Sequence, residues 1–330
     1  MARPVRRSKL PVGLVVLALV GVAIGALISL AQRGDPDAGQ AQELAALKES
    51  SERRAASGGD KAADEPRLCG ELRRAPVGTV KDTSLEELSG LVQSRRDGKL
   101  LWGIEDSGNP AQLSAIRPNG TVVGRWNVAG AENFDWEDVA TGPGAPGGAA
   151  WLYAADIGDN LRQREHVTIY RVPEPAAPSG GGTTAPAQAL QLRYPDGAHD
   201  AESFLVDPKR GTLVLVTKGV PGAVYAASRP ASWSGTVKLR KIHGAGIAYA
   251  TAADVSADSR TVALRGYFNV ALWQRKGNEP LTATLRRTPC TSPTGLDDGQ
   301  GEAIALASNG RSAWIVAEGN TPPIRRLTPR

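Results

Sequence analysis

A short acidic or polar motif recurs five times after residue 66, and this repeat limits the folds that the chain can adopt. Its copies begin at Glu87, Asp135, Asp200, Thr251 and Gln300, a spacing of about fifty residues that is typical of propeller repeats. Each copy leads into a second apolar segment that ends in a charged residue. Short runs of β-branched and aromatic residues alternate with Gly, Pro, Asn and Asp, which indicates strands throughout. The repeat therefore predicts an all-β protein.

Small sheets repeated around an axis form a β-propeller, so we expect a five-bladed β-propeller over residues 66–330. Only residues 324–328 follow the second strand of the fifth repeat, whereas an unassigned strand at residues 67–77 precedes the first repeat. The two ends of the chain are therefore expected to share one blade. This closure brings Cys69 close to Cys290, and we expect a disulfide between them; the alternative is two unrelated thiols.

The beginning of the chain has the pattern of a membrane anchor. Residues 1–9 carry four basic side chains, and the uncharged apolar run at residues 10–31 is long enough to cross a bilayer as a helix. Residues 32–65 are polar, contain no aromatic residue and predict a stalk. We expect a single-pass protein of the cell membrane, with its C-terminal domain outside the cytoplasm. A cleaved signal peptide and a buried helix of a soluble fold are the alternatives.

Charge and composition argue against several classes of partner and cofactor. Residues 66–330 contain 30 basic against 26 acidic side chains, scattered along the sequence, so the chain is not expected to bind nucleic acid. Three histidines and two cysteines without a C-x-x-C motif argue against a zinc site. We expect a monomer.

The repeated motif also predicts where polar side chains gather. In a propeller the first strand of each blade lines the axis, and side chains two residues apart point the same way. One predicted ring contains Glu87, Asp135, Asp200, Thr251 and Gln300. The other contains Ser89, Glu137, Glu202, Ala253 and Glu302. The ends of the second strands add Asp106, Asp156, Lys218, Arg265 and Glu318 at the same mouth.

Carboxylates this close together repel one another unless they are protonated or neutralised. Ca²⁺ is a hard cation that accepts about six to eight oxygen ligands, so it is the expected cofactor. Lys218 and Arg265 are expected to face an anionic ligand. The alternative is that the acids only bond the backbone of neighbouring blades.

Several strings resemble those of the calcium-activated nucleotidases, a family of five-bladed apyrases: Glu87-Leu-Ser89, Trp136-Glu137, Glu202-Ser203 and Gln300-Gly-Glu302, together with Asp106, Lys218 and Arg265. The resemblance implies a calcium ion on the axis and cleavage of nucleoside di- and triphosphates. It implies Ser89, Glu137, Glu202 and Glu302 as the metal ligands. The fourth repeat departs from the pattern, because Ala253 stands where an oxygen is expected and only Thr251 or Asp254 could substitute.

A second resemblance is carried by Asp135-Trp-Glu-Asp, Asp156-Ile-Gly-Asp-Asn and Gln300-Gly-Glu-Ala. These strings are similar to those of uncharacterised secreted bacterial propellers, which are grouped with phytase-like or esterase-like propellers. This resemblance covers nearly the whole of residues 66–330 and implies the fold but no particular reaction.

We therefore expect an extracytoplasmic calcium-binding propeller that hydrolyses a phosphorylated or otherwise anionic small molecule. Its candidate catalytic residues are Glu87, Asp135, Asp200, Lys218 and Arg265, with an acid as general base. The alternative is a non-catalytic scaffold that binds an extracellular protein. A six-bladed lactonase-like enzyme would need a sixth acidic repeat, which the sequence does not contain.

Overall fold

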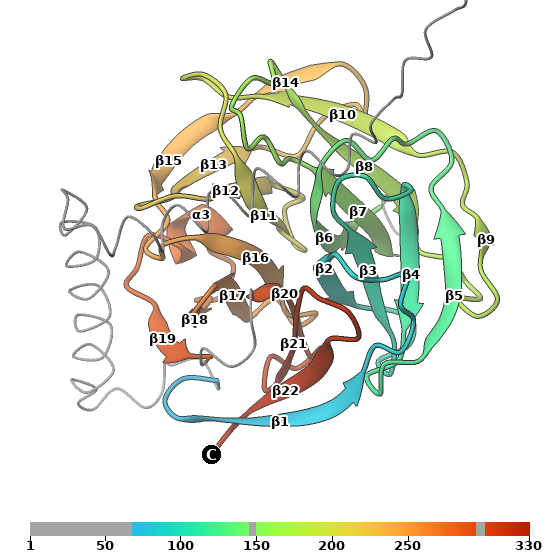
Figure 1. The fold of residues 1–330 in the computed structure, drawn as a ribbon. Coiled ribbons are helices and arrows are strands. Elements are labelled where there is room, and N and C mark those ends of the chain that lie inside the picture. Colours follow the sequence, from blue (N-terminus) through green and yellow to red (C-terminus); the bar gives the residue numbers. More distant parts are fainter. Residues whose placement is uncertain (1–67, 145–149, 295–300) are drawn as a thin grey trace, which may run out of the picture. The chain divides into compact units, whose positions relative to one another are not determined.

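The computed structural model describes residues 68–144, 150–294 and 301–330, and these residues form five sheets arranged around one axis (Figure 1). Strands β2, β6, β11, β16 and β20 lie nearest the centre of Figure 1, and each contacts the innermost strands of the blades on both sides. Neighbouring strands within a blade are antiparallel, except for two short edge strands. The predicted all-β, five-bladed propeller is confirmed.

Each blade is built from four or five strands, which are named below from the axis outward. Blade one contains β2 (Leu88–Gln93), β3 (Leu101–Glu105), β4 (Gln112–Ile116), β5 (Val122–Asn127) and β9 (Gly182–Thr183). Blade two contains β6 (Trp136–Pro143), β7 (Ala150–Asp156), β8 (Val167–Pro173), β10 (Gln188–Arg193) and β14 (Thr236–Lys238). Blade three contains β11 (Ala201–Val206), β12 (Leu213–Thr217), β13 (Ala223–Ala227) and β15 (Arg240–Gly244).

The last two blades have four strands each. Blade four contains β16 (Ala250–Val255), β17 (Thr261–Gly266), β18 (Asn269–Gln274) and β19 (Cys290–Pro293), with the short helix α3 (Leu281–Thr284) between its outer strands. Blade five contains β20 (Gly301–Leu306), β21 (Ala313–Ala317), β22 (Pro323–Pro329) and β1 (Leu72–Thr79). The first described strand therefore completes the last blade, as the strand count predicts.

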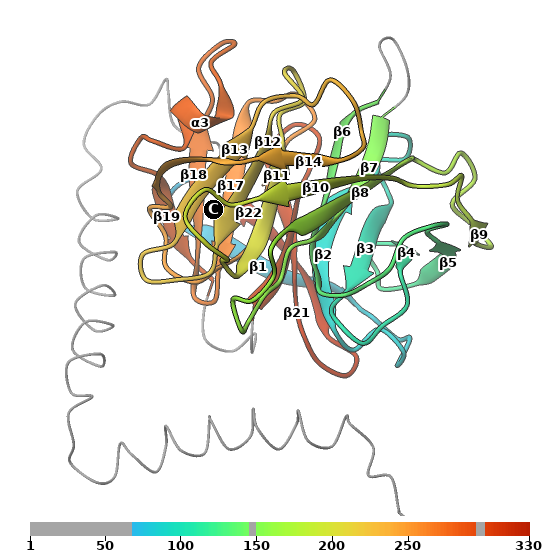
Figure 2. The same cartoon turned by 90° about the horizontal axis from the view of Figure 1, so that it is seen from above.

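Three strands belong to a different blade from the strands that flank them in the sequence. β1 pairs antiparallel with β22 and closes the ring. β9 comes from the chain between β8 and β10 but pairs with β5 of blade one. β14 follows the third strand of blade three but pairs with β10 of blade two, and Figure 2 shows the two strands side by side. These exchanges connect blades that are consecutive around the axis.

Apolar cores fill the spaces between adjacent blades, because each sheet buries side chains on both faces. Trp102 and Trp136 lie in the core between blades one and two, and both are fully buried. Tyr153 and Phe204 occupy the core between blades two and three. Burying such a side chain contributes about 1.5–3 kcal/mol, so the stability of the ring resides mainly in these interfaces.

Two further links add to the apolar contacts between blades. The predicted disulfide between Cys69 and Cys290 is confirmed, with Cα atoms 5.7 Å apart. Cys290 begins β19, so the bridge connects the outer strand of blade four to the segment that enters blade five. Between blades three and four, Arg275 donates two hydrogen bonds to the carboxylate of Asp207, at 3.0 and 2.9 Å, and both side chains are fully buried.

The expected membrane anchor, cytoplasmic tail and stalk fall at residues 1–65, outside the described residues, and stay predictions. Within the described ranges, no helix combines the length and hydropathy needed to cross a bilayer.

Candidate functional site

A β-bulge lies near the beginning of the innermost strand in every blade. Pairing with the second strand passes from Leu88 to Gly90 in blade one and from Trp136 to Asp138 in blade two, and each other blade has the same shift. A bulge leaves one residue unpaired and redirects its side chain. We call the five skipped residues the bulge ring: Ser89, Glu137, Glu202, Thr251 and Glu302.

The bulge ring corrects the register that the sequence predicted for blade four. Pairing there passes from Ala250 to Ala252, so Thr251 and not Ala253 is the bulge residue. Ala253 lies further along β16, where its backbone N–H donates to Asp138 Oδ2 at 2.9 Å. Every blade therefore contributes an oxygen-bearing side chain to the ring.

Arg265 also lies two residues away from its expected position. It pairs with Ala252 inside β17, and its side chain is buried. Its Nη1 donates to the backbone oxygens of Ala303 at 2.6 Å and Val316 at 2.8 Å. Arg265 therefore holds blade four against blade five instead of facing the mouth, and Tyr267 is the residue that follows the second strand there.

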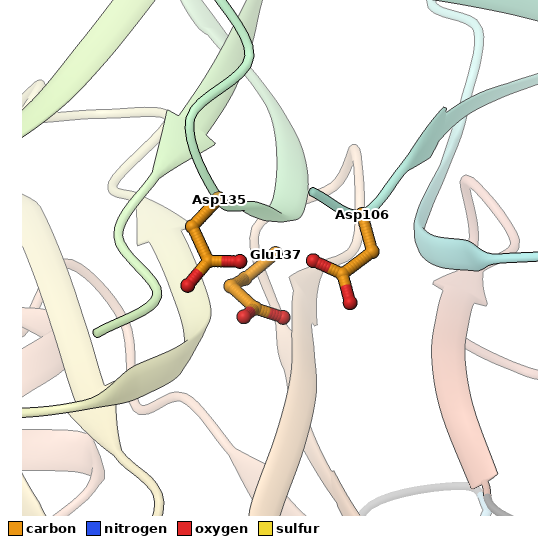
Figure 3. Close-up of side chains that lie close together, drawn as sticks. All are labelled: Asp106, Asp135 and Glu137. Atoms are coloured by element: carbon orange, nitrogen blue, oxygen red, sulfur yellow. The ribbon is translucent and has the colours of Figure 1, made fainter. Parts of the chain in front are cut away.

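Five carboxylates gather where the innermost strands begin, and we call them the acidic centre: Asp106, Asp135, Glu137, Asp200 and Glu202. Carboxylate oxygens of Asp106, Asp135 and Glu137 lie within 4.8 Å of one another, and Figure 3 shows these three groups pointing toward a common space. Oxygens of Glu137, Asp200 and Glu202 also lie within 4.8 Å of one another. Glu137 belongs to both groups, and either group could hold a metal ion.

Burial and mutual repulsion raise the pKa of several acids in and beside the acidic centre. Burial first, and then the charges of Asp106 and Asp200, raise the pKa of Asp135 to about 7. Burial followed by the charge of Glu202 raises the pKa of Glu137 well above its ordinary range. At the edge of this region, burial and the charge of Glu302 raise the pKa of Glu318 to about 7. A cation bound between these carboxylates would relieve the repulsion that contributes to the shifts.

Lys218 partly compensates one side of the acidic centre. Its ammonium group forms an ion pair with Glu202 Oε1 and lies 5.3 Å from the centroid of the Tyr267 ring. Burial and the nearby charge of Glu202 raise the pKa of Tyr267 to about 12. Glu202 Oε2 is buried and accepts no hydrogen bond among the described residues. A buried carboxylate oxygen of this kind is a suitable ligand for a hard cation.

The two hydroxyls of the bulge ring bond the neighbouring blades. Ser89 Oγ donates to the backbone oxygen of Trp136 at 2.8 Å, and Thr251 Oγ1 donates to that of Gly301 at 2.6 Å. Each hydroxyl oxygen keeps acceptor capacity after donating its proton. These contacts fix the direction of both side chains without excluding them from a coordination shell.

Two other predicted site residues, Glu87 and Glu302, lie beside the acidic centre. Glu87 is at the exposed rim, where its Oε2 accepts a hydrogen bond from Asn109 Nδ2 at 2.8 Å. Glu302 is buried on blade five, and its charge raises the pKa of both Glu202 and Glu318 after the larger effect of burial. Gln300 lies outside the described residues.

Other buried acids of the inner strands have a purely structural role. Asp138 Oδ2 accepts hydrogen bonds from the backbone N–H groups of Phe204 at 2.8 Å and Ala253 at 2.9 Å. Asp254 Oδ2 accepts one from Leu306 at 2.7 Å. The expected bonding of acids to the backbone of neighbouring blades thus occurs at these two residues, and within the acidic centre it occurs at Asp200.

The loop after β7 packs directly on the acidic centre, and its sequence, rich in Asp, Asn and Gly, resembles an oxygen-rich calcium loop as much as a hairpin turn. A Cβ atom on Gly158 would overlap the carboxylates of Glu137 and Asp135. The next residue, Asp159, donates its backbone N–H to Asp200 Oδ1 at 3.0 Å. The acidic centre therefore has a close-fitting wall at Gly158, where a side chain would displace these two carboxylates.

A cavity of about 930 Å³ lies away from the acidic centre. It is lined by turns at the opposite end of the propeller, including Asp97 between β2 and β3, Arg117 between β4 and β5, and Ser308 between β20 and β21. Arg117 and Asp97 form an ion pair across part of this lining. The cavity therefore contributes nothing to the carboxylate site.

The fold and the acidic centre together define a five-bladed β-propeller with a carboxylate-lined mouth. No protein-family model and no curated protein matches the sequence. Among solved structures, a gluconolactonase from Xanthomonas campestris is similar with 14% identity and a TM-score of 0.39, over 69% of this chain and 68% of that one. A glucose dehydrogenase is similar with 8% identity and a TM-score of 0.44, over 78% of this chain and 99% of that one.

Proposed function

We propose that this chain is a calcium-binding propeller that hydrolyses a phosphorylated or otherwise anionic small molecule outside the cytoplasm. The proposal rests on two clusters of three carboxylates that share the buried Glu137. One cluster also contains Asp106 and Asp135, and the other also contains Asp200 and Glu202. All donors are oxygens, which suits a hard cation such as Ca²⁺. The raised pKa values of Asp135 and Glu137 supply the electrostatic reason for binding one.

The residues of the acidic centre divide into ligands and a base. Glu137 and Glu202 from the bulge ring, with Asp106 and Asp200 beside them, are the ligands that the cation would meet. When bound, the cation supplies charge neutralisation for an anionic substrate and lowers the pKa of a bound water. Asp135, whose carboxylate lies within 4.8 Å of those of Asp106 and Glu137, is placed to remove a proton from the attacking water.

Lys218 is the cation available at the mouth for the negative charge of the substrate. It lies beside Glu202 and is only partly buried, so its ammonium group can reach a ligand bound over the acidic centre. Glu87 is the remaining candidate catalytic acid and lies at the exposed rim of this mouth. Ser89, Thr251 and Glu302 complete the bulge ring.

The experiment that tests the proposal is turnover by the purified full-length chain in detergent, with EDTA or with added Ca²⁺. Nucleoside di- and triphosphates, phosphate monoesters and carboxylate esters are the substrates to try. We expect calcium-dependent product release that falls by about 10²–10⁴ in Asp135→Asn, because the general base is lost. Glu86→Gln, an exposed neighbouring carboxylate, is the matched control. Turnover that is unaffected by EDTA and by Asp135→Asn would overturn the proposal.

A scaffold that binds an extracellular protein is the second candidate. It is favoured by Asp138 and Asp254, which show that buried acids in this propeller hold blades together. If the protein is a scaffold, EDTA lowers its melting temperature and the protein cleaves none of the tested esters or anhydrides. The same measurement therefore separates the two functions.

We further propose that residues 10–31 anchor the chain in the cell membrane as a monomer, with the propeller outside. The disulfide between Cys69 and Cys290 supports an oxidising compartment, since such bonds are rare in the cytoplasm. Protease treatment of intact cells tests the orientation: digestion of the propeller only after lysis would contradict it.

A further inference from the structure

A second cavity, of about 630 Å³, opens between blades two and three on the same side of the propeller as the acidic centre. Its walls are the loop that follows Asp159, the segment from Arg193 to Ala198, and strand β14. Cavities of about 300–1,000 Å³ are the size that small-molecule ligands occupy. We call it the cationic pocket, because three basic side chains and one acid line it: Arg164, Arg193, Lys238 and Glu165.

Two of the basic side chains oppose each other directly. Arg193 of β10 pairs in register with Lys238 of β14, so both side chains lie on the same face of the blade. Like charges in opposed positions are destabilising. Glu165 lies 3.5 Å from Arg193, but both side chains are mostly exposed, so this ion pair contributes little. Lys238 forms no ion pair with any described residue, and an anion would relieve the repulsion.

Arg164 connects the cationic pocket to the acidic centre. Its Nη1 lies 2.7 Å from Asp156 Oδ1 and donates to the backbone oxygen of Gly158 at 2.8 Å. Asp156 Oδ1 in turn accepts the backbone N–H of Asp135 at 3.1 Å. The guanidinium is thereby held in one orientation, 4.6 Å from the centroid of the Phe134 ring. Its other nitrogens form no hydrogen bond with a described residue and can bind a ligand.

The segment from Arg193 to Ala198 is held firmly at Asp196, so this wall of the cationic pocket is preformed. Asp196 accepts hydrogen bonds from Tyr225 Oη at 3.0 Å and from Lys241 Nζ at 2.8 Å, and its carboxylate lies 3.0 Å from His199 Nε2. Although burial opposes the shift, these hydrogen bonds lower the pKa of Asp196 to about 2. The rings of Tyr194 and Tyr225 pack edge to face at 4.9 Å. A preformed site loses little free energy to ordering when a ligand binds.

We propose that the cationic pocket binds a doubly charged anion, such as a phosphoryl group, through Arg164, Arg193 and Lys238. Planar guanidinium groups match the oxygens of a phosphoryl group, and two of them line this pocket together with an ammonium group. That the pocket binds an anion does not depend on the proposed function. Only the further step, that this anion is part of the substrate, rests on it. Binding itself needs no metal, because none of the three cations belongs to the acidic centre.

Isothermal titration of the full-length chain in detergent with inorganic pyrophosphate, in EDTA, tests the inference. We expect wild-type protein to bind and Arg193→Gln/Lys238→Gln to bind at least about tenfold more weakly, because two charge-assisted contacts are lost. Both side chains are exposed, so the variant should fold, and circular dichroism checks this. Lys81→Gln/Arg311→Gln removes the same charge from exposed positions outside the pocket and is the matched control.

Three outcomes would overturn the inference: no binding by the wild type, equal binding by the pocket variant, or equal weakening in the control. Titration with glycerol phosphate and with a short-chain phosphatidic acid identifies the source of the phosphoryl group. Equal affinity indicates a soluble ligand, and much tighter binding of the lipid indicates a headgroup; both support the pocket. Because EDTA is present throughout, a failure of this binding is distinct from a failure of calcium-dependent turnover.

Discussion

Replacing Glu137 with Gln tests whether the acidic centre is a repulsive site that needs a cation. Glu137 belongs to both clusters of three carboxylates in the acidic centre. Burial together with neighbouring charges raises its pKa. A raised pKa means that the folded protein favours the protonated form. The stability of the metal-free chain is therefore greatest below the ordinary pKa of 4.5 and is lost as the pH rises toward the folded-state pKa. Gln has nearly the shape of the protonated acid and never ionises.

The neighbouring Asp135 sets the scale of the effect. Its pKa rises from 3.8 to about 7, through burial first and the charge of Asp106 second. A shift of about three units corresponds to roughly 4 kcal/mol, an upper limit that relaxation of the site and entry of water reduce. We therefore expect Glu137→Gln to add about 1–2 kcal/mol to the free energy of unfolding of the metal-free chain at alkaline pH. For a domain of this size, the melting temperature rises by about 2–8 °C.

Thermal unfolding of the full-length chain, followed by circular dichroism in EDTA, measures this effect. At about pH 4, below the ordinary pKa of 4.5, the wild type and Glu137→Gln should melt together, and at about pH 8 the variant should melt higher. Adding Ca²⁺ at about a hundred times its Kd stabilises the wild type by roughly 2.7 kcal/mol, and the variant by much less. Glu86→Gln is the control for losing one carboxylate at an exposed position.

Two results would refute the reasoning. If Glu137→Gln is less stable than the wild type at both pH values in EDTA, the carboxylate holds the blades together and is not repelled by its neighbours. If Ca²⁺ stabilises both chains equally, Glu137 is not a ligand.

Three further predictions concern the surroundings of the site. Gly158→Ala places a methyl group on two carboxylates of the acidic centre, so calcium affinity measured by titration should fall at least about tenfold; an unchanged affinity would contradict this geometry. Arg275→Met leaves Asp207 buried without its partner and should cost about 3–5 kcal/mol in urea unfolding, whereas a loss below about 1 kcal/mol would show that the pair is not buried. Cys69→Ser with Cys290→Ser removes a link across 221 residues and should cost about 2–5 kcal/mol; an unchanged urea midpoint would count against the bridge.

The number of blades and the closure of the ring could be predicted from the sequence, because both depend on counting strands. Strand runs with acidic or polar beginnings recur in every blade, and the strand deficit at the C-terminus matches the surplus before the first repeat. The edge strands β9 and β14 could not be predicted in the same way. They are two and three residues long, and they pair parallel with a blade that their own sequence neighbours do not form.

The register of blade four was mispredicted because two aspartates with similar bonding lie at different positions. Asp138 and Asp254 each accept a backbone N–H from a neighbouring blade, but Asp254 lies two residues further along its strand, measured from the bulge. Aligning the two acids moved Ala253 into the ring in place of Thr251. A bulge has no side-chain signature, so only the pairing of β16 with β17 reveals the shift.

The uneven distribution of charge around the mouth leads to a final prediction. Lys218 compensates Glu202, whereas Asp106, Asp135 and Glu137 form no ion pair with a described residue, so a cation is most needed on the side of blades one and two. Asp156 and Arg164 lie between this side and the cationic pocket.

A cation at the acidic centre and an anion in the cationic pocket would therefore attract each other across a short, partly buried path. Linkage requires that Ca²⁺ raises the affinity for pyrophosphate by the same factor as pyrophosphate raises the affinity for Ca²⁺. We expect a factor of about five or more, measured by titrating each ligand at saturating concentrations of the other and correcting for their complex in solution. Arg164→Gln should reduce this factor more than Lys81→Gln does. Independent binding of the two ligands would show that the pocket and the acidic centre do not act on one substrate.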